Sequence, residues 1–175
     1  MLQGVDKMSY NRIGDNMVKK TNAVRLVMQS GIACTEAFYE FNENDLNGNH
    51  AAAALGIPPE QVFKTLVARG DRTGVNVFCI PVCATLDLKK AAKCTGDKRV
   101  ELVPVKELLS LTGYIRGGCS PVGMKKRYPT FLDESCLRFS RIAVSAGERG
   151  HQMLLPPKEL AALVHAAFEN LIVQQ

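Results

Sequence analysis

A glycine-rich segment at residues 112–127, TGYIRGGCSPVGMKKR, combines residue types that can bind an anion. Gly117 and Gly118 give the backbone conformational freedom, and Pro121 restricts it within the same turn. Such a loop can direct several backbone N–H groups toward one anion, or toward the oxyanion that develops during acyl transfer. Ser120 adds a hydroxyl group. The segment therefore indicates an anion-binding loop, and a tight turn followed by a solvated basic surface is the structural alternative.

A lysine interrupts an apolar strand pattern upstream of this loop. Residues 61–68, QVFKTLVA, are rich in β-branched and apolar side chains, and a turn signal follows at 70–74. Alternation places Lys64 on the same strand face as Val62 and Leu66, where its ammonium is costly to desolvate unless it is paired or lines a cleft. Lys64 is therefore a candidate site residue. A lysine that protects an edge strand from aggregation is the alternative.

These segments occur in the order and spacing of a known family. The chain resembles the YbaK/EbsC proteins, within the group of prolyl-tRNA synthetase-associated editing domains, from about residue 21 to residue 168. The matching blocks are Lys64-Thr65-Leu66, residues 86–93, Thr112-Gly113-Tyr114, residues 117–127, Val144-Ser145 and Arg149-Gly150. The resemblance implies a trans-acting aminoacyl-tRNA deacylase that needs no cofactor. Mischarged Cys-tRNA(Pro) is the first candidate substrate, and Ala- or Ser-specific editing is the alternative.

The same resemblance implies roles for individual residues. Lys64 would be the catalytic residue that holds the aminoacyl or terminal-adenosine end and stabilises developing negative charge. The implied substrate-binding residues are Tyr39, Thr65, Gly117, Gly118, Ser120, Ser145 and Gln152. Gln152 stands where the family often carries an acid, so it can hydrogen-bond the substrate's amino group but cannot pair with it as a carboxylate does. In the Cys-specific branch the substrate's own thiol would attack the ester, which removes the need for a general base from the protein.

Other catalytic patterns are absent from the sequence. It contains no GxSxG, HExxH or GxxxxGK[ST] pattern. The cysteines show no CxxC pair and no histidine at zinc-ligand spacing, so we expect reduced thiols and no metal site. Cys119 lies inside the glycine-rich loop, but family members carry an apolar residue there. We therefore do not expect Cys119 to be a nucleophile.

Composition and charge are those of an ordinary soluble protein. The 175-residue chain has 46% apolar residues and a net charge of +5, which is compatible with nucleic acid but does not establish it. Basic residues concentrate at 89–99 and 125–127, and they would suit phosphates if they surround the cleft. No apolar run reaches the roughly 20 residues that span a bilayer, and the start lacks a secretory signal. We therefore expect a cytoplasmic protein that binds neither membranes nor DNA.

Alternating helix and strand patterns predict one mixed α/β domain at residues 21–175, preceded by a loosely ordered extension at 1–20. Expected helices lie at 22–30, 49–55, 87–94, 104–111 and from 156 onward, and expected strands at 32–41, 62–69, 75–82, 99–103, 130–133, 140–145 and 151–155. The last helix is expected to bury Leu160, Leu163, Val164 and Phe168. The family resemblance implies a curled, partly barrel-like mixed sheet flanked by helices.

Two other functional classes remain open at this level. In a non-catalytic tRNA- or synthetase-binding module, Lys64 would contact phosphate only. A small-molecule-binding protein would have no salt-dependent RNA affinity. The resemblance also implies prolyl-tRNA synthetase as a partner, because free deacylases of this family have little tRNA surface of their own.

Overall fold

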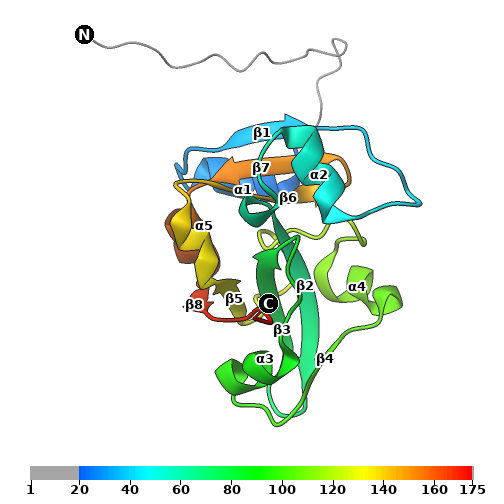
Figure 1. The fold of residues 1–175 in the computed structure, drawn as a ribbon, viewed down its shortest axis with the longest axis vertical. Helices are drawn as coiled ribbons and strands as arrows, with labels where there is room; N and C mark the ends of the chain where they lie inside the picture. Colours follow the sequence, from blue (N-terminus) through cyan, green and yellow to red (C-terminus); the bar gives the residue numbers. More distant parts are fainter. Residues whose placement is uncertain (1–19, 175) are drawn as a thin grey trace.

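Residues 20–174 form one mixed α/β domain in the structure, a computed structural model that describes this part of the chain (Figure 1). The α-helices are α1 (Asn22–Gln29), α2 (Gly48–Leu55), α3 (Leu88–Thr95), α4 (Val105–Thr112) and α5 (Pro157–Val164). The strands are β1 (Thr35–Phe38), β2 (Phe63–Gly70), β3 (Gly74–Pro81), β4 (Val100–Leu102), β5 (Thr130–Asp133), β6 (Ile142–Glu148), β7 (His151–Leu155) and β8 (Ala167–Glu169). Two short 3₁₀ helices are η1 (Pro59–Gln61) and η2 (Glu134–Arg138). The extension expected at 1–20 lies, except for its last residue, outside the described residues.

The strands divide between two sheets, which corrects the single curled, partly barrel-like sheet that the resemblance implied. The smaller sheet has the order β1-β7-β6 and the larger one β4-β2-β3-β5-β8. β2 and β3 form the hairpin expected from the sequence, and β5 runs parallel to β3, so the larger sheet is mixed as predicted. Val62, the residue before β2, forms one isolated parallel bridge with Ala143 of β6. One bridge does not continue one sheet into the other, and within residues 20–174 neither sheet closes.

Local sequence signals account for most helix ends. Thr21 caps α1 by accepting a hydrogen bond from the Val24 N–H (3.2 Å), and Asp87 caps α3 through the N–H groups of its first turn. Gly56 and Gly96 end α2 and α3 in the left-handed backbone conformation. None of the helices within residues 20–174 is long and apolar enough to cross a membrane.

The end of the last helix differs from the prediction. His165 adopts a left-handed φ of 55° and ends α5, so Phe168 does not extend the buried stripe of that helix. Phe168 belongs to β8, which pairs in parallel with β5. The helical spacing was misleading because pairing with a distant strand, which no local pattern shows, decides the conformation of this segment.

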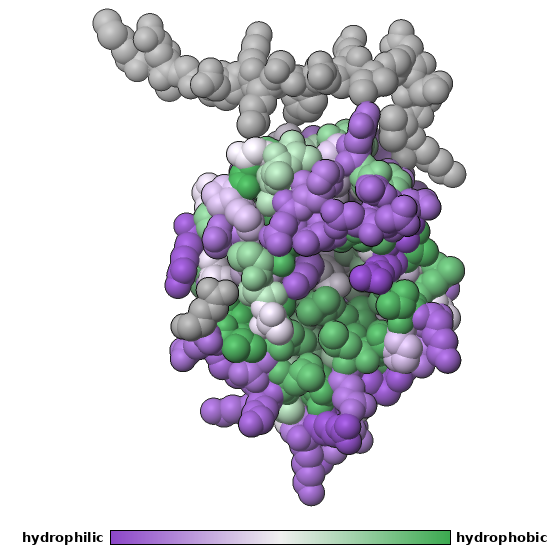
Figure 2. Space-filling model, turned by 45° about the vertical axis from the view of Figure 1, so that its right-hand side comes forward, coloured by the Kyte–Doolittle hydropathy of each residue, from purple (hydrophilic) through white to green (hydrophobic). Residues whose placement is uncertain are grey.

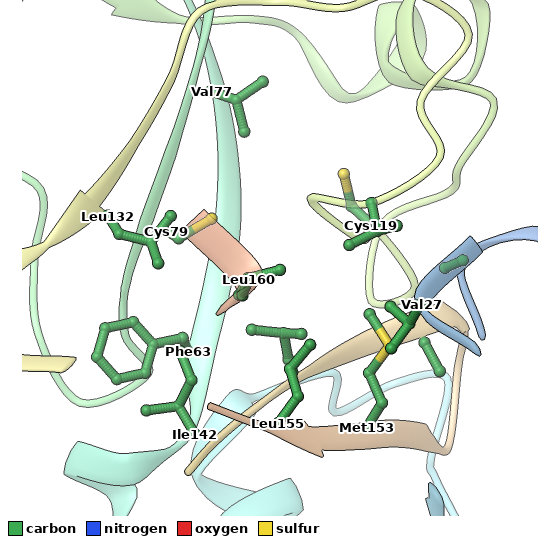
Figure 3. Close-up of a cluster of buried hydrophobic side chains, with 14 of the residues drawn as sticks. Val27, Phe63, Val77, Cys79, Cys119, Leu132, Ile142, Met153, Leu155 and Leu160 are labelled. Carbon is green, nitrogen blue, oxygen red and sulfur yellow. The ribbon is translucent and has the colours of Figure 1, made fainter. Parts of the chain in front are cut away.

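The main hydrophobic core lies between the two sheets. Figure 3 shows side chains of both sheets directed into one space, among them Phe63 and Leu132 from the larger sheet and Met153 and Leu155 from the smaller one. Cys119 from the glycine-rich loop packs into the same cluster, and burial raises the pKa of its thiol to about 12. At neutral pH this thiol is therefore protonated.

Candidate functional site

The candidate site lies where one edge of β2 has no neighbouring strand. β3 covers the other edge along the whole strand. On the open edge, β6 approaches at the Val62–Ala143 bridge, β4 pairs with β2 over Ala68–Gly70, and the Val103 N–H just after β4 donates to the Val67 carbonyl. A cavity of about 560 Å³ is lined by the stretch between these contacts. Figure 2 shows this face hollowed, with hydrophilic side chains above the hollow and a broad hydrophobic surface below it. The division into two sheets thus creates the space for a ligand.

Lys64 lines the cavity from the open stretch of β2. Its Nζ donates a hydrogen bond to the backbone carbonyl of Val82 at 3.4 Å. Burial lowers the pKa of the Lys64 ammonium below the usual lysine value, and a charged Cys83 thiolate nearby would act in the opposite direction. An ammonium group has three N–H donors, so Lys64 can hold a ligand while it keeps the Val82 contact. The cavity therefore contains a partly desolvated cation.

The glycine-rich loop forms another wall of the cavity. Gly117 lines it with a left-handed φ of 86°, and a β-carbon there would lie 3.2 Å from Leu46 Cδ2. Gly118 is buried and is absent from the lining; a β-carbon there would come within 3.0 Å of the Glu148 Cα. Ser120 is fully buried, and its Oγ accepts a hydrogen bond from the Val122 N–H (3.2 Å). The structure thus brings Gly117 to the cavity and leaves Gly118 and Ser120 in supporting positions.

Ser145 and Gln152 line the cavity from the smaller sheet. They pair directly across β6 and β7, and a β-bulge follows between Ser145 and Glu148. Ser145 Oγ accepts a hydrogen bond from the Gly147 N–H at 3.2 Å, which leaves its O–H free to donate. Gln152 is only 6% exposed, and its buried Oε1 has no hydrogen-bond partner within residues 20–174. An unpaired buried amide oxygen is costly, so this atom marks a position where a ligand donor can bind.

Tyr39 lines the cavity close to His50, a residue that the sequence did not single out for the site. The two rings are 6.4 Å apart between centroids. The Tyr39 N–H donates to the Gly150 carbonyl at 2.9 Å, which ties the chain after β1 to the β6–β7 turn. Tyr39 is therefore held against the turn that leads into β7, the strand that carries Gln152.

Thr65 lines the cavity from the open stretch of β2. Its Oγ1 lies 3.7 Å from Cys79 Sγ on the core side of β3, as strand alternation predicts. The Val62 carbonyl accepts from Val82 across the β3 edge, and the Val67 carbonyl accepts from Val103 across the other edge. Peptide groups alternate in direction along a strand, so the N–H and C=O of Thr65 point the same way as those of Val67, toward the open edge.

Sequence reasoning missed two groups of lining residues. Arg116 and Arg149 line the cavity, and Arg149 Nε donates to the Arg116 carbonyl at 2.9 Å. An apolar group comes from β4, α4 and the turn between them: Leu102, Val103, Val105 and Leu108. The basic clusters at 89–99 and 125–127, by contrast, contribute no residue to the lining. Arg116 could have been found from its position next to Gly117, but the apolar group depends on strand pairing that the sequence does not show.

The lining offers the cations of Lys64, Arg116 and Arg149, together with backbone donors and hydroxyl groups. His50 Nε2 contacts the Glu40 carbonyl at 3.3 Å, and no hydrogen bond found in residues 20–174 joins His50 to a hydroxyl or thiol group. No group of three or more His, Cys, Asp or Glu side chains in that range could hold a metal ion. This arrangement suits positioning an ester and stabilising an oxyanion, rather than attack by a protein nucleophile.

Comparison with known proteins identifies a family for this chain. Residues 49–163 match a family described as the aminoacyl-tRNA editing domain. A protein of Enterococcus faecalis, "Putative Cys-tRNA(Pro)/Cys-tRNA(Cys) deacylase EbsC", is 44% identical over 157 residues, which cover 90% of this chain and 96% of the relative. The "Uncharacterized protein YwhH" of Bacillus subtilis is 31% identical over 122 residues, covering 70% of this chain and 77% of that protein.

Solved structures show the same fold. One, described as a "putative trans-editing enzyme for prolyl tRNA synthetase", superimposes with a TM-score of 0.74 at 27% identity and covers 88% of this chain and 99% of its own. Another, described as a hypothetical protein, has a TM-score of 0.78 at 22% identity and covers 86% of this chain and 98% of its own. Because the identity to this second structure is only 22%, its similarity shows the fold alone.

Proposed function

The chain belongs to the aminoacyl-tRNA editing domain family, and we propose that it is a trans-acting deacylase that hydrolyses mischarged Cys-tRNA(Pro). The observation that carries this proposal is the cavity at the open edge of β2, where the cation of Lys64, the backbone of Gly117 and the unpartnered amide of Gln152 meet. The relative that bears the deacylase name aligns over almost its whole length, which supports the same reaction class.

In the proposed reaction the substrate's cysteinyl thiol attacks its own ester carbonyl. A C–S bond forms, the C–O bond to the ribose breaks, and the proton lost by the thiol ends on the ribose oxygen. The cyclic thioester released in this step then takes up water and opens to free cysteine. Because attack turns the carbonyl oxygen into an oxyanion, the protein needs to position the ester and stabilise negative charge rather than supply a nucleophile.

The lining residues can position the ester and stabilise negative charge, while the substrate supplies the nucleophile. Lys64 donates to the oxyanion or the ester oxygen, and Gly117 permits close approach of the substrate to the backbone. Gln152 Oε1 accepts a hydrogen bond from the substrate's α-amino group, while Ser145 and Tyr39 border the amino-acid end. Thr65 contributes its backbone at the open strand edge. Gly118 and Ser120 do not contact the substrate; they pack inside the glycine-rich loop and hold Gly117 in position.

Prolyl-tRNA synthetase is the proposed partner. A solved relative is described as a trans-editing enzyme for that synthetase, and the basic clusters at 89–99 and 125–127 lie outside the cavity lining, so another protein that holds the tRNA would assist binding. Size-exclusion chromatography of the two proteins with tRNA, together with the deacylation rate at limiting enzyme, tests this. Absence of both co-elution and any change in rate would remove the synthetase from the proposal.

A matched panel of Cys-, Ala-, Ser- and Pro-tRNA(Pro) tests the function directly. The wild type should release cysteine fastest, and Lys64→Ala should lose this activity while its tRNA affinity changes little. Lys93→Ala is the control, because Lys93 is an exposed lysine on α3 outside the cavity lining. Preferential hydrolysis of Ala- or Ser-tRNA(Pro) would replace the thiol-assisted step. Absence of hydrolysis with every substrate, with or without synthetase, would favour a non-catalytic binding module.

A further inference from the structure

We propose that His151 is a positioning residue for the deacylation, because its contacts with Glu36 and Glu148 hold the three strands of the smaller sheet together beside the cavity. We call these three side chains the His151 cluster. None of them lines the cavity, so the cluster acts through its neighbours and does not touch the substrate. This inference rests on the proposed function, because the reaction that it affects is the deacylation.

His151 is buried at the start of β7, with a carboxylate at each ring nitrogen. It is 1% exposed. Its Nδ1 lies 2.8 Å from Glu148 Oε1, and its Nε2 lies 3.0 Å from Glu36 Oε2. The ring of Phe38 stacks on the imidazole, with 4.1 Å between centroids and 22° between the planes. Glu36 and Phe38 belong to β1 and Glu148 to β6, so one buried ring connects all three strands of the smaller sheet.

The two contacts require two protons on the ring. A carboxylate only accepts hydrogen bonds and a neutral imidazole has one N–H group, so only the imidazolium can donate to both carboxylates. Imidazole binds a proton more tightly than a carboxylate does, which places the second proton on His151 rather than on Glu36 or Glu148. Loss of that proton leaves a buried lone pair facing a carboxylate and breaks one contact. The connection between the strands therefore depends on pH.

The imidazolium is the cation that both carboxylates share. Within residues 20–174, no Lys or Arg nitrogen lies within 4.0 Å of either carboxylate of the cluster. Arg149, in the turn before His151, lines the cavity instead. Burial and then the charge of Glu36 raise the pKa of the nearby Cys34 thiol, while Arg141 acts in the opposite direction, so this thiol is uncharged at neutral pH. No other charged group in this part of the chain can therefore take the place of the ring.

The cluster adjoins cavity-lining residues on both sides. His151 lies between Gly150 and Gln152, which both line the cavity. Neighbouring side chains of a strand point to opposite faces, so the imidazole lies on the face of β7 behind Gln152. Glu148 pairs with His151 across the β-bulge, and Gly118 of the glycine-rich loop packs on the Glu148 backbone. A broken contact in the cluster therefore displaces two walls of the cavity.

Glu148→Gln and Glu36→Gln test the requirement for the second proton. An amide donates as well as accepts, so in either variant a neutral imidazole can keep a hydrogen bond at both nitrogens. Deacylation of Cys-tRNA(Pro) is measured over the pH range in which histidine titrates, and nitrogen NMR follows the His151 ring in parallel. His165→Asn is the control, because His165 is an exposed histidine outside the cavity lining and Asn tolerates its left-handed φ of 55°.

The wild-type ring should carry two N–H groups at neutral pH. As the pH rises, kcat/KM of each glutamine variant should increase relative to the wild type, and the midpoint should be that of the His151 titration. This ratio removes the ionisation of the substrate thiol and of Lys64, which affect both proteins alike. It should change about tenfold, within the roughly 100-fold that a displaced active-site group can cost, and kcat should change more than KM. The side-chain amide resonances of Gln152 should shift with the same midpoint.

His151→Phe removes both N–H groups and keeps an aromatic ring against Phe38. It should lower kcat/KM about tenfold or more at every pH, while His165→Asn should match the wild type. If His151→Phe fails to fold, the two glutamine variants still decide the question.

Three results would overturn the inference: a single N–H on the wild-type His151 ring at neutral pH, a ratio of rates that stays constant with pH, or the same pH-dependent change in His165→Asn. Failure of the proposed function looks different, because the wild type would hydrolyse no aminoacyl-tRNA while the His151 and Gln152 resonances still shared one midpoint. An active wild type whose Gln152 resonances do not follow His151 would retain the deacylase and remove the positioning role.

Discussion

Ser145 and Gln152 lie directly opposite each other on β6 and β7, and they are the last regular pair before the bulge that precedes Glu148. Both line the cavity. The same bulged turn receives the glycine-rich loop, since Gly118 packs on the Glu148 backbone, and it holds Tyr39 through the Gly150 carbonyl. The smaller sheet therefore carries these cavity-lining side chains at the place where its regular pairing ends.

Lys64 should set the alkaline limit of the reaction. Burial lowers the pKa of Lys64, so its ammonium loses its proton below the pH of about 10.4 that an exposed lysine requires. The substrate thiol has to ionise first, so kcat/KM should rise with pH through thiol ionisation and fall as Lys64 deprotonates. In Lys64→Arg the guanidinium stays charged, and the alkaline fall should move to higher pH even if the maximum rate is lower. An unchanged alkaline limit in that variant would show that another group titrates.

Gln152→Met should raise stability and lower activity together. The substitution removes a buried amide oxygen without a partner, which should increase the free energy of unfolding by about 1 kcal/mol. It also removes the proposed acceptor for the substrate's amino group, so kcat/KM should fall about tenfold. Urea unfolding and deacylation kinetics measure the two effects.

Ser135→Ala is the control for this substitution, because Ser135 Oγ is likewise buried without a partner but lies outside the cavity lining. It should stabilise the protein without changing the rate. Equal rates for the wild type and Gln152→Met would exclude a contact between Gln152 and the substrate.

The adjacent glycines should respond differently to alanine. In Gly118→Ala the new β-carbon would meet the Glu148 backbone at 3.0 Å, and such overpacking costs about 1–3 kcal/mol. In Gly117→Ala the φ of 86° costs about 1 kcal/mol, and the flexible Leu46 side chain can move away. Gly117→Ala should therefore lose more activity than stability, because its methyl group enters the cavity.

Gly74→Ala is the control for backbone strain alone, since its φ is 77° and no atom lies within 4 Å of a β-carbon there. It should match the stability loss of Gly117→Ala and keep full activity. Thermal unfolding and kcat/KM for all three variants complete the comparison. A larger stability loss for Gly117→Ala than for Gly118→Ala would contradict the packing described above.

Asp97 should control stability without affecting the reaction. Burial alone would raise the pKa of its carboxyl, but hydrogen bonds from the hydroxyls of Thr73 and Thr95 and from the N–H groups of Thr73 and Arg72 hold that pKa well below the usual range. A carboxyl with a lowered folded-state pKa stabilises the fold above its unfolded-state pKa of about 3.9 and loses this contribution as the pH falls below that value.

Asp97→Asn should therefore unfold at a lower temperature than the wild type at neutral pH, and the difference should shrink below about pH 4. Melting temperatures across this pH range provide the measurement, and the deacylation rate at 25 °C serves as the control because Asp97 is outside the cavity lining. A difference in melting temperature that stays constant with pH would rule out the ionised carboxylate as its source.

The sequence by itself determined the features that depend on neighbours along the chain. Residue types and spacing account for the helix caps Thr21 and Asp87 and for the β2–β3 hairpin, because cap hydrogen bonds and turns join residues only a few positions apart. The family blocks around Lys64 and Gly117 can likewise be identified from the sequence alone.

Tertiary structure alone decided how distant segments meet. Contacts between residues far apart in sequence divide the strands into two sheets and pair β8 in parallel with β5. Tertiary packing also buries Ser120 outside the cavity lining. Leu102 joins Lys64 on one face only through the register of β4 on β2, and Arg149 reaches Arg116 only through the packing of the β6–β7 turn. Many arrangements of these helices and strands are compatible with the local sequence patterns. Burial of apolar surface and strand pairing determine which arrangement forms, and both depend on the whole fold.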